Sequence, residues 1–361
     1  MNKEIILAGS ILGQGGVGKI LSFVADNLLK NGFTVTVLSL RNEERPSFLP
    51  DKAHFISLQK EKSNNRLLRR AEELCNLRKC LRKYKPFVIC TFGSEPSVMV
   101  RLATVGFKNT TVISAERSDP YTLPKFWKIM SSWAYKHSDY CVFQLEKQRD
   151  FYGEKVRGKS FVIPNPFIWK SSVPVVDKKR KVVVSAGRFV YQKGYDTLIR
   201  AFAKVSERHP DYRLELYGGG DDYEKYEEII KELKLNSKVL LFNYVKDITS
   251  VIANCSVFVL SSRFEGIPNV LIEAMSLGIP TVATDCTPGG PAFLTDNGKR
   301  GLLVPVDDVD EIAKAICRIL EDPELSRSLS SSGKDICKIL NEDKIATKWA
   351  NMFTSILNQK Q

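Results

Sequence analysis

The sequence predicts an α/β protein made of two doubly wound, Rossmann-like parallel sheets. Short runs rich in Val, Ile and Leu alternate with amphipathic helical patterns, which is typical of βαβ units and hence of parallel sheets covered by helices. The alternation stops at PNPFIWKSSVPVVDKKRK (164–181), rich first in Pro and then in basic residues, and afterwards starts again. Two similar halves joined by a linker indicate two domains facing each other across a cleft, with ligands beyond the carboxyl ends of the strands.

In the first half, the pattern predicts strands at EIILAGSIL (4–12), FTVTVLSL (33–40), FVICTF (87–92), TTVISAE (110–116) and YCVFQ (140–144). The glycine-rich segment GQGGVGKI (13–20) follows the first strand and leads into a helix expected over 16–31. Glycines at such a place bring bare backbone N–H groups and a helix N-terminus close to an anion. The segment therefore predicts contact with a phosphate but does not name the ligand.

Two nucleotide-binding motifs overlap in this segment. Residues 13–19 spell GxxxxGK, most of a triphosphate-binding loop, but Ile20 stands where such a loop needs Ser or Thr for magnesium. The same glycines spell GxGxxG, the dinucleotide fingerprint. The acid expected after the second strand is displaced, so Arg41 would have to hold the 2′-phosphate of NADP. An NADP-dependent enzyme therefore stays open as an alternative.

The positive charge of the chain is concentrated in its first half. Residues 1–170 carry 28 basic and 15 acidic side chains, a net charge of +13, whereas 171–361 carry 26 of each. The stretch 60–85 alone holds ten basic and three acidic residues. An apolar stripe runs along the helix expected there, formed by Leu67, Ala71, Leu74 and Leu81. Such a helix suits an anionic membrane surface or an anionic, lipid-linked substrate, or it is merely a solvated basic face.

Other classes of protein are not indicated. No interleaving of aromatic and basic residues points to nucleic acid. The start, MNKEIILAGS, lacks a signal-peptide cleavage site, and every apolar run is far shorter than the roughly 20 residues that cross a bilayer. We therefore expect a cytoplasmic protein, peripheral at the inner face of the cell membrane. The three histidines are scattered and form no HxxxH pair, so no metal site is expected.

In the second half, strands are expected at VVVSAG (182–187), RLELYG (213–218), VLLFNY (239–244), VFVLSS (257–262) and PTVAT (280–284), and helices at 194–208, 221–234, 247–254 and 269–277. Arg188 comes directly after the first of these strands and Lys193 five residues later. At the carboxyl edge of a sheet, a planar guanidinium and a point-like ammonium are suited to grip a diphosphate.

Two glutamates eight residues apart follow a later strand. Glu265 ends the loop after VFVLSS, and Glu273 lies among apolar residues in the helix expected over 269–277. An acid in such surroundings needs partners, and each hydroxyl of a sugar or ribose would contribute about 1.5–3 kcal/mol by bonding a charged carboxylate. The start of the same helix, at 268–270, offers N–H groups to a phosphate. Together these groups fit a nucleotide-sugar as the ligand.

In their order, the motifs resemble those of retaining glycosyltransferases of family 4, which have the GT-B fold. The likeness spans nearly the whole chain and rests on GGVGK (15–19), VIPNP (162–166), GRFVYQKG (187–194), FEGIPNVLIEAM (264–275) and DCTPGGPAFL (285–294) followed by GLLVPV (301–306). It implies an acceptor-binding domain over 1–168 and a donor-binding domain over 175–344. A C-terminal helix at about 345–361 is expected to pack back on the first domain.

By that resemblance, Arg188 and Lys193 bind the donor diphosphate. Glu265 then binds the transferred sugar, and Glu273 the ribose. Further substrate contacts are implied for Gly15, Gly16, Gly266, Ile267, Asn269, Val270, Gly289, Gly290 and Arg117. Two positions depart from the pattern: Glu116 and Arg117 stand where many relatives have a His, and Phe293 stands where relatives with GGPAE have an acid.

The resemblance implies retaining hexosyl transfer without a metal or other cofactor. A UDP-hexose or UDP-N-acetylhexosamine is the favoured donor, with GDP-mannose as the alternative. The acceptor implied is a lipid-linked glycan in surface polysaccharide assembly. A glycoside hydrolase would use Glu265 and Glu273 as acid and nucleophile, but that interpretation leaves Arg188, Lys193 and the glycine segment without a role.

Overall fold

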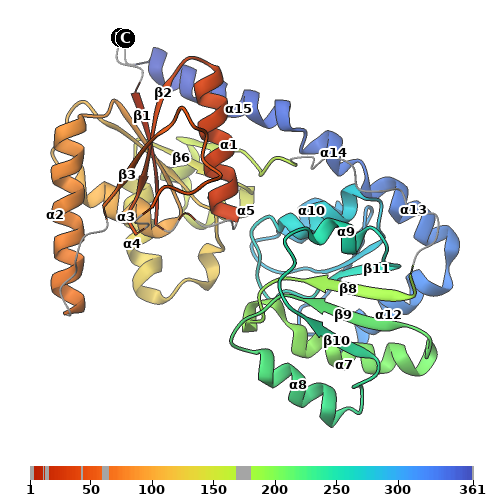
Figure 1. Ribbon diagram of the computed structural model, residues 1–361. Coiled ribbons are helices and arrows are strands. Elements are labelled where there is room, and N and C mark those ends of the chain that lie inside the picture. Colours follow the sequence, from red (N-terminus) through yellow and green to blue (C-terminus); the bar gives the residue numbers. More distant parts are fainter. Residues whose placement is uncertain are drawn as a thin grey trace. The chain divides into compact units, whose positions relative to one another are not determined.

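The computed structural model describes residues 4–10, 12, 16–41, 44–58, 65–167 and 180–359 (Figure 1). The chain divides into two compact units, each built around its own parallel sheet. Unit 1 consists of Met1–Pro166 and Glu342–Gln361, and unit 2 of Phe167–Asn341. The last segment of the chain therefore belongs to the same unit as the first.

Within the described residues, unit 1 contains seven parallel strands in the order β3-β2-β1-β4-β5-β6-β7. They are β1 Glu4–Gly9, β2 Thr34–Ser39, β3 His54–Ser57, β4 Val88–Phe92, β5 Thr111–Ala115, β6 Tyr140–Phe143 and β7 Ser160–Val162. Five of these strands are predicted from the sequence, and the prediction of a parallel sheet is confirmed. The two strands that the sequence does not reveal, β3 and β7, are short and lie at the two edges.

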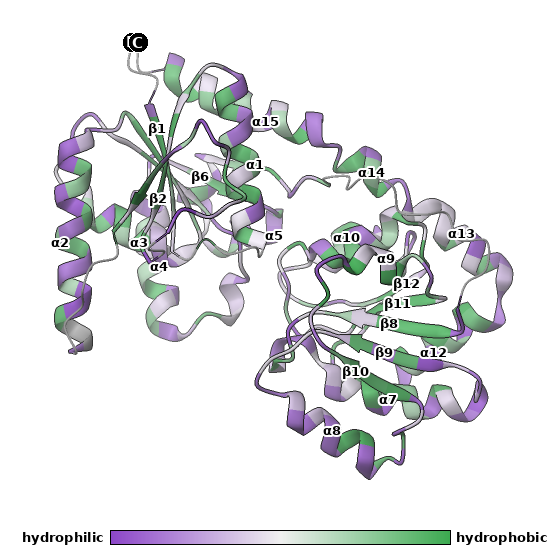
Figure 2. Ribbon diagram, in the orientation of Figure 1, coloured by the Kyte–Doolittle hydropathy of each residue, from purple (hydrophilic) through white to green (hydrophobic). Residues whose placement is uncertain are grey.

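Helices cover both faces of this sheet. They are α1 Gly16–Lys30, α2 Arg66–Tyr84, α3 Ser94–Ala103, α4 Lys125–His137, α5 Glu146–Phe151, α6 Glu154–Arg157 and α15 Glu342–Asn358, with a 3₁₀ turn at Pro120–Thr122. Ile5 and Leu7 of β1 pack with α1 and α15, whereas Ile6 and Ala8 pack with α2 and α3 on the other face, as the two-residue period of a strand requires. Strands covered on both faces read as continuous apolar runs, and Figure 2 shows them so.

The basic helix expected within 60–85 is α2, and its apolar side faces the sheet. Leu77 and Leu81 are buried, and Leu74 packs partly buried against the same cluster. The side chain of Leu67 lies outside the described residues. The rest of α2 is largely hydrophilic (Figure 2), so its apolar stripe is used for packing within unit 1. In the described part of the chain, every helix is too short or too polar to act as a transmembrane segment.

Unit 2 repeats this architecture with six parallel strands among its described residues, in the order β10-β9-β8-β11-β12-β13. The strands are β8 Val182–Ala186, β9 Arg213–Tyr217, β10 Val239–Phe242, β11 Val257–Leu260, β12 Thr281–Thr284 and β13 Leu302–Val304. The helices are α7 Tyr195–Arg208, α8 Tyr223–Glu232, α9 Ile248–Ile252, α10 Asn269–Ser276, α11 Gly290–Thr295, α12 Val309–Glu321, α13 Pro323–Gly333 and α14 Ile336–Ile339, with a 3₁₀ turn at Tyr191–Lys193. The doubly wound second half is thus confirmed.

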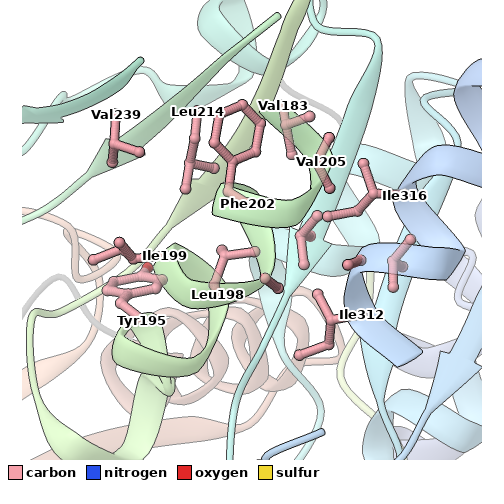
Figure 3. Close-up of a cluster of buried hydrophobic side chains, with 14 of the residues drawn as sticks. Val183, Tyr195, Leu198, Ile199, Phe202, Val205, Leu214, Val239, Ile312 and Ile316 are labelled. Atoms are coloured by element: carbon pink, nitrogen blue, oxygen red, sulfur yellow. The ribbon is translucent and has the colours of Figure 1, made fainter. Parts of the chain in front are cut away.

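One core of unit 2 lies between its sheet and the helices α7, α8 and α12 (Figure 3). Phe202 of α7 and Ile316 of α12 pack beside Val183 of β8 and Leu214 of β9. The apolar side chains of α7 recur every three or four residues, which gives the helix one continuous buried stripe. This packing fixes α7 against the sheet, and with it the loop that leads from β8 into the helix.

The C-terminal helix α15 completes the core of unit 1. Trp349 is fully buried, and its ring stacks on Phe92 of β4 and on Phe353, with centroid distances of 5.9 and 6.2 Å. Met352 and Ile356 of the same helix are also buried in this cluster. Unit 1 therefore depends on residues that follow the whole of unit 2 in the sequence.

Replacing Trp349 by Ala should lower the free energy of unfolding of unit 1 by about 3–5 kcal/mol, because a large buried side chain leaves a cavity. Hydrogen exchange, followed separately on peptides of the two units, measures this and should show faster exchange in unit 1 alone. Lys348→Ala, on the exposed side of the same helix, is the matched control and should change stability by less than about 0.5 kcal/mol. Equal effects of the two substitutions would contradict the role given to α15.

Candidate functional site

The candidate site of unit 2 forms where its strand order reverses. β8 and β11 are hydrogen-bonded neighbours at that point, so the loop after β8 (187–194) and the loop after β11 (261–268) leave the same edge of the sheet side by side. In open α/β sheets, ligands bind beyond the carboxyl ends of the strands at such a reversal. These two loops carry Arg188, Lys193 and Glu265.

An ion pair between Lys193 Nζ and Glu265 Oε1 joins the two loops. The side chains of Lys193 and Glu265 are 13% and 12% exposed, which makes a pairing of their charges necessary. Ser262 donates its hydroxyl to the same carboxylate oxygen at 3.1 Å. The other carboxylate oxygen has no hydrogen-bond partner among the described residues, so Glu265 keeps an acceptor for a ligand hydroxyl.

Two glycines make this pairing sterically possible. A Cβ at Gly187 would lie 2.8 Å from Cε of Lys193. Gly194 has φ +62°, and a Cβ there would lie 2.2 Å from the backbone oxygen of Ser261, which no real side chain tolerates. The hydroxyl of Ser261 in turn donates to the backbone oxygen of Lys193 at 2.8 Å. The glycines of GRFVYQKG therefore allow the two loops to touch.

Arg188 lies at the exposed rim of the same loop. Its guanidinium Nη2 is 3.4 Å from Oε1 of Gln192, and the amide of Gln192 donates to the backbone oxygen of Phe264 at 2.9 Å. Arg188 has no ion-pair partner among the described residues, so its charge is available to an anion. Lys193 and Glu265 are thus brought together, and two hydrogen bonds through Gln192 connect Arg188 to the loop that carries Glu265.

The loop after β12 (285–289) packs against the same region. The backbone N–H of Glu265 donates to the backbone oxygen of Thr287 at 2.9 Å. A Cβ at Gly290 would lie 1.5 Å from the backbone oxygen of Gly266, and Gly289 has φ +97°, so both glycines are required there. The predicted residues Gly266, Gly289 and Gly290 therefore form one contact between neighbouring loops.

The start of α10 lies directly behind this contact. Ile267 is buried, whereas Asn269, Val270 and Glu273 are half-buried. Glu273 lies in the second turn of α10, whose neighbouring residues Leu271, Ile272, Ala274 and Met275 are buried. The first backbone N–H groups of an α-helix lack partners within the helix, so α10 directs partial positive charge toward the carboxyl edge of the sheet.

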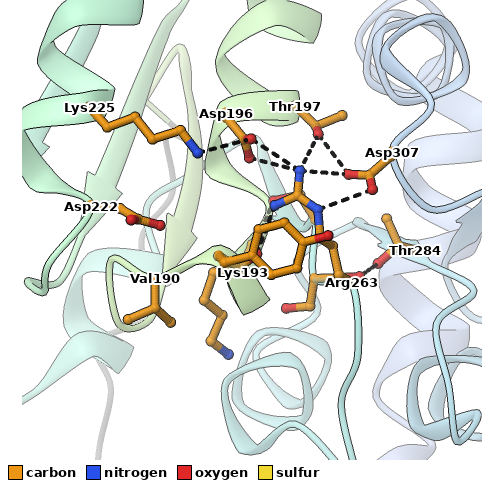
Figure 4. Close-up of polar contacts among 12 residues, drawn as sticks. Val190, Lys193, Asp196, Thr197, Asp222, Lys225, Arg263, Thr284 and Asp307 are labelled. Atoms are coloured by element: carbon orange, nitrogen blue, oxygen red, sulfur yellow. Dashed lines mark hydrogen bonds and ion pairs between the residues drawn. The ribbon is translucent and has the colours of Figure 1, made fainter. Parts of the chain in front are cut away.

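Arg263 ties four segments of unit 2 together (Figure 4). Its Nη2 lies 3.1 Å from Oδ1 of Asp196 in α7 and 2.8 Å from Oδ1 of Asp307, after β13. Its Nη1 donates to the backbone oxygen of Tyr191 at 2.7 Å, and its guanidinium lies 4.2 Å from the centre of the Tyr191 ring. Burial alone would lower the pKa of Arg263, but the two carboxylates raise it above the usual arginine value. The residue holds the turn that ends at Lys193.

Arg263, Ser262 and Gln192 are residues of this region that the sequence did not predict. A usable signal exists for the first two, because they are polar residues directly after the buried strand β11, next to Glu265. The carboxylate partners of Arg263 and the carbonyl that accepts from Gln192 lie on other segments of the chain. Two groups around Arg263, the side chains of Thr197 and Asp307, are 110 residues apart and bond each other. Only the folded chain brings these groups together.

Unit 1 has its own polar contact at the reversal of its strand order, between β1 and β4. Ser10, after β1, donates its hydroxyl to Glu95 in the first turn of α3 at 2.6 Å. Arg41 and Arg70 also pair with Glu95. Burial alone would raise the pKa of Glu95, but the bond from Ser10 and the two guanidinium groups lower it. The Arg41 cation that an NADP site would use is thus engaged in an ion pair.

The predicted glycines of unit 1 are described in part. Gly16 is the exposed first residue of α1, and Gly15 lies outside the described residues. The helix nevertheless begins where the sequence predicts, at Gly16 within the glycine-rich segment.

Glu116 and Arg117 lie inside unit 1 after β5. The carboxylate of Glu116 accepts hydrogen bonds from Ser94, Tyr152 and, on its other oxygen, Ser118. The Arg117 side chain points into the interior, with its guanidinium carbon 5.5 Å and 5.2 Å from the ring centres of Phe92 and Trp349. Arg117 is 9% exposed, and its three guanidinium nitrogens have no hydrogen-bond partner among the described residues. Burial lowers its pKa to about 10.

One group of possible metal ligands occurs among the described residues, and it lies apart from the loops above. His209, Cys317 and Glu321 bring ligand atoms within 4.8 Å of one another at the ends of α7 and α12. Arg208 also pairs with Glu321 at 2.7 Å. A guanidinium on the same carboxylate opposes a cation, so the geometry is that of an ion-pair cluster.

Comparison with known proteins gives a family match within the second unit. Residues 170–336, all within unit 2, match the family model of glycosyl transferases group 1. Unit 2 is therefore similar to this family over nearly its whole length, and the two units share the GT-B fold with solved structures.

Several known proteins are similar to this chain over nearly its full length. The sucrose-phosphate synthase from Thermosynechococcus elongatus is 20% identical with a TM-score of 0.83, covering 99% of this chain and 100% of that one. Anabaena HepE, solved in complex with UDP, is 18% identical with a TM-score of 0.79, covering 98% and 100%. A Campylobacter jejuni alpha-1,4-N-acetyl-D-galactosaminyltransferase, named for the acceptor GalNAc-alpha-(1->4)-GalNAc-alpha-(1->3)-diNAcBac-PP-undecaprenol, is 24% identical over 96% of this chain and 97% of its own.

Arg263→Ala should lower the free energy of unfolding of unit 2 by about 3 kcal/mol, because the side chains of Arg263 and Asp196 are only 10% and 20% exposed and Asp196 would lose this guanidinium. Urea denaturation measures the change. Arg200→Ala is the matched control: Arg200 is also paired with a carboxylate, but both side chains are exposed, so about 0–1 kcal/mol is expected. Arg263→Lys keeps the charge and should recover part of the loss. Unchanged stability in Arg263→Ala would contradict the role of Arg263 in holding these segments of unit 2 together.

Proposed function

We propose that this protein is a glycosyltransferase that moves a hexose or N-acetylhexosamine from a nucleotide-diphosphate sugar to a lipid-linked glycan, with retention of configuration. The observation that carries the proposal is the pairing of Lys193 with Glu265 at the strand reversal of unit 2, beside an unpaired Arg188. Cations suit a diphosphate and a carboxylate suits sugar hydroxyls. A site with cations next to a carboxylate therefore fits a molecule in which a diphosphate is joined to a sugar.

In the proposed reaction, the bond between the anomeric carbon and the diphosphate oxygen breaks, and an acceptor hydroxyl forms the new bond on the same face. The hydroxyl proton passes to the departing diphosphate. Arg188, Lys193 and the N-terminus of α10 stabilise the negative charge that grows on that group. Glu265 bonds hydroxyls of the transferred sugar, Glu273 bonds the ribose, and Gly15 and Gly16 approach the donor from unit 1.

Three positive groups serve the leaving diphosphate, so we propose that transfer needs no metal ion or other cofactor. Activity that survives EDTA would support this part, and activity restored by Mg²⁺ or Mn²⁺ after EDTA would overturn it. The test leaves the roles of Arg188 and Lys193 open to separate measurement.

We propose UDP as the nucleotide, because Anabaena HepE was solved with UDP and the C. jejuni relative is named as an N-acetylgalactosaminyltransferase. The diphospho-undecaprenol in that relative's name and the basic first half of this chain favour a lipid-linked acceptor at the inner membrane face, in surface polysaccharide assembly. A GDP-mannose donor is the alternative. Radiolabelled transfer from a panel of UDP- and GDP-sugars to lipid-linked glycans decides between them.

A thermal-shift panel with UDP, GDP, ATP and NADP separates this function from the NADP-dependent alternative. We expect UDP to raise the unfolding temperature, because a ligand that binds the folded state alone stabilises it. Stabilisation by NADP or ATP without any effect of UDP or GDP would overturn the proposal.

Lys193→Gln and Arg188→Gln should each lower kcat by about two to four orders of magnitude, the scale of losing a preorganised group that stabilises charge in the transition state. Steady-state kinetics with the radiolabelled donor measures the loss. Lys204→Gln is the matched control. Lys204 lies eleven residues after Lys193, but its ammonium pairs with Asp310 and so connects α7 to α12. Full activity in Lys193→Gln would contradict the proposed role.

A further inference from the structure

The helix α4 of unit 1 exposes two large apolar side chains. Phe126 and Ile129 are 65% and 60% exposed, and the half-buried Trp133 follows at the next turn on the same side. The buried side of α4 carries Ser131 and Ala134 with Tyr135, most of them small or hydroxylated. The usual arrangement, with bulky apolar residues turned inward, is therefore reversed in this helix.

The charge of α4 has one sign. Lys125, Lys128 and Lys136 lie on the helix, and its sequence KFWKIMSSWAYKH contains no acid. None of the three lysines has an ion-pair partner among the described residues. An open depression beside the apolar side chains is lined by Lys128, Ile129, Ser132, Trp133, Lys136 and His137. Exposed apolar and aromatic side chains next to unpaired lysines match a bilayer with anionic headgroups.

The other basic helix of unit 1, α2, does not offer this combination. Its buried leucines Leu77 and Leu81 pack on the sheet, and Arg70 pairs with Glu73 and Glu95. Among the described residues of α2, the exposed large apolar side chains are Leu68 and Tyr84, at 57% and 37%. These two lie at opposite ends of α2, whereas the apolar side chains of α4 lie within two turns and next to its lysines.

We propose that the outward face of α4, formed by Phe126, Ile129 and Trp133 with Lys125, Lys128 and Lys136, docks unit 1 on an anionic membrane surface. The helix lies in the plane of the interface, with the apolar side chains among the acyl chains and the ammonium groups at the phosphates. This inference deepens the proposed function, because a lipid-linked acceptor has its diphosphate at that surface.

Flotation of the full-length protein with vesicles tests the proposal. Wild type should float with vesicles of phosphatidylcholine and phosphatidylglycerol and stay behind with phosphatidylcholine alone. Phe126→Ser/Ile129→Ser should lower the partition coefficient at least about tenfold, because two apolar side chains no longer insert. Leu68→Ser, an equally apolar and exposed position on α2, is the matched control and should bind like wild type.

A second pair of variants separates the charges of the two helices. Lys125→Gln/Lys128→Gln/Lys136→Gln should lower partitioning about a hundredfold at low salt. Lys79→Gln/Arg82→Gln/Lys83→Gln removes three exposed charges from α2 and should lower it about tenfold or less. Circular dichroism confirms that each variant is folded.

Three results would overturn the proposal: no flotation of wild type, a greater loss in the α2 charge variant than in the α4 one, or unchanged flotation of Phe126→Ser/Ile129→Ser. In the last case, light scattering that shows a dimer in wild type and a monomer in the variant would assign the face to a second copy of the chain. Flotation requires no transfer reaction, so its outcome is independent of the proposed activity. Transfer to a detergent-dispersed acceptor should be equal in wild type and in the α4 variants.

Discussion

The ion pair between Lys193 and Glu265 is the constraint on which the candidate site of unit 2 depends. Both charges are largely withdrawn from water, so each needs the other while no ligand is present. A diphosphate that attracts Lys193 would leave Glu265 unpaired, unless a hydroxyl reaches the carboxylate at the same time. On the proposed assignment, a nucleotide-sugar supplies both groups in one molecule, whereas a free nucleotide supplies one. The pair therefore links recognition of the phosphate to recognition of the sugar.

The supporting contacts follow from this constraint. The reversal of strand order places the loops after β8 and β11 next to each other. A side chain at 194 would collide with the backbone of Ser261, and one at 187 would collide with the side chain of Lys193. Arg263 then fixes the turn that ends at Lys193 through the carbonyl of Tyr191, so the lysine is positioned by a neighbour whose own charge is paired with carboxylates. Preorganised charges of this kind stabilise a transition state without reorganising during the reaction.

Much of the fold can be predicted from the sequence, because strands covered on both faces leave continuous apolar runs. The edge strands β3 and β7 are not predicted, because they lack such runs. Their sequences, HFIS and SFV, are only four and three residues long and half exposed. In the candidate site, spacing predicts that Arg188, Lys193 and Glu265 share an edge of the sheet, but it cannot predict that two of them pair. The same limit applies to Arg117, whose guanidinium lies over the rings of Phe92 and Trp349 and so joins segments more than 200 residues apart.

The sequence also does not predict which side of an amphipathic helix packs on the protein and which side faces outward. Both α2 and α4 are basic with an apolar side, and composition favours α2, which has more charge. In the fold, however, α4 and not α2 has the more exposed apolar side. The leucines of α2 pack on the sheet of unit 1, whereas α4 packs on α3 and β6 with the side that carries Tyr135 and small residues. Tyr135 faces inward since its hydroxyl reaches the carboxylate of Glu116 at 3.3 Å. With that side of α4 committed to a buried polar contact, Phe126 and Ile129 are left on the outside.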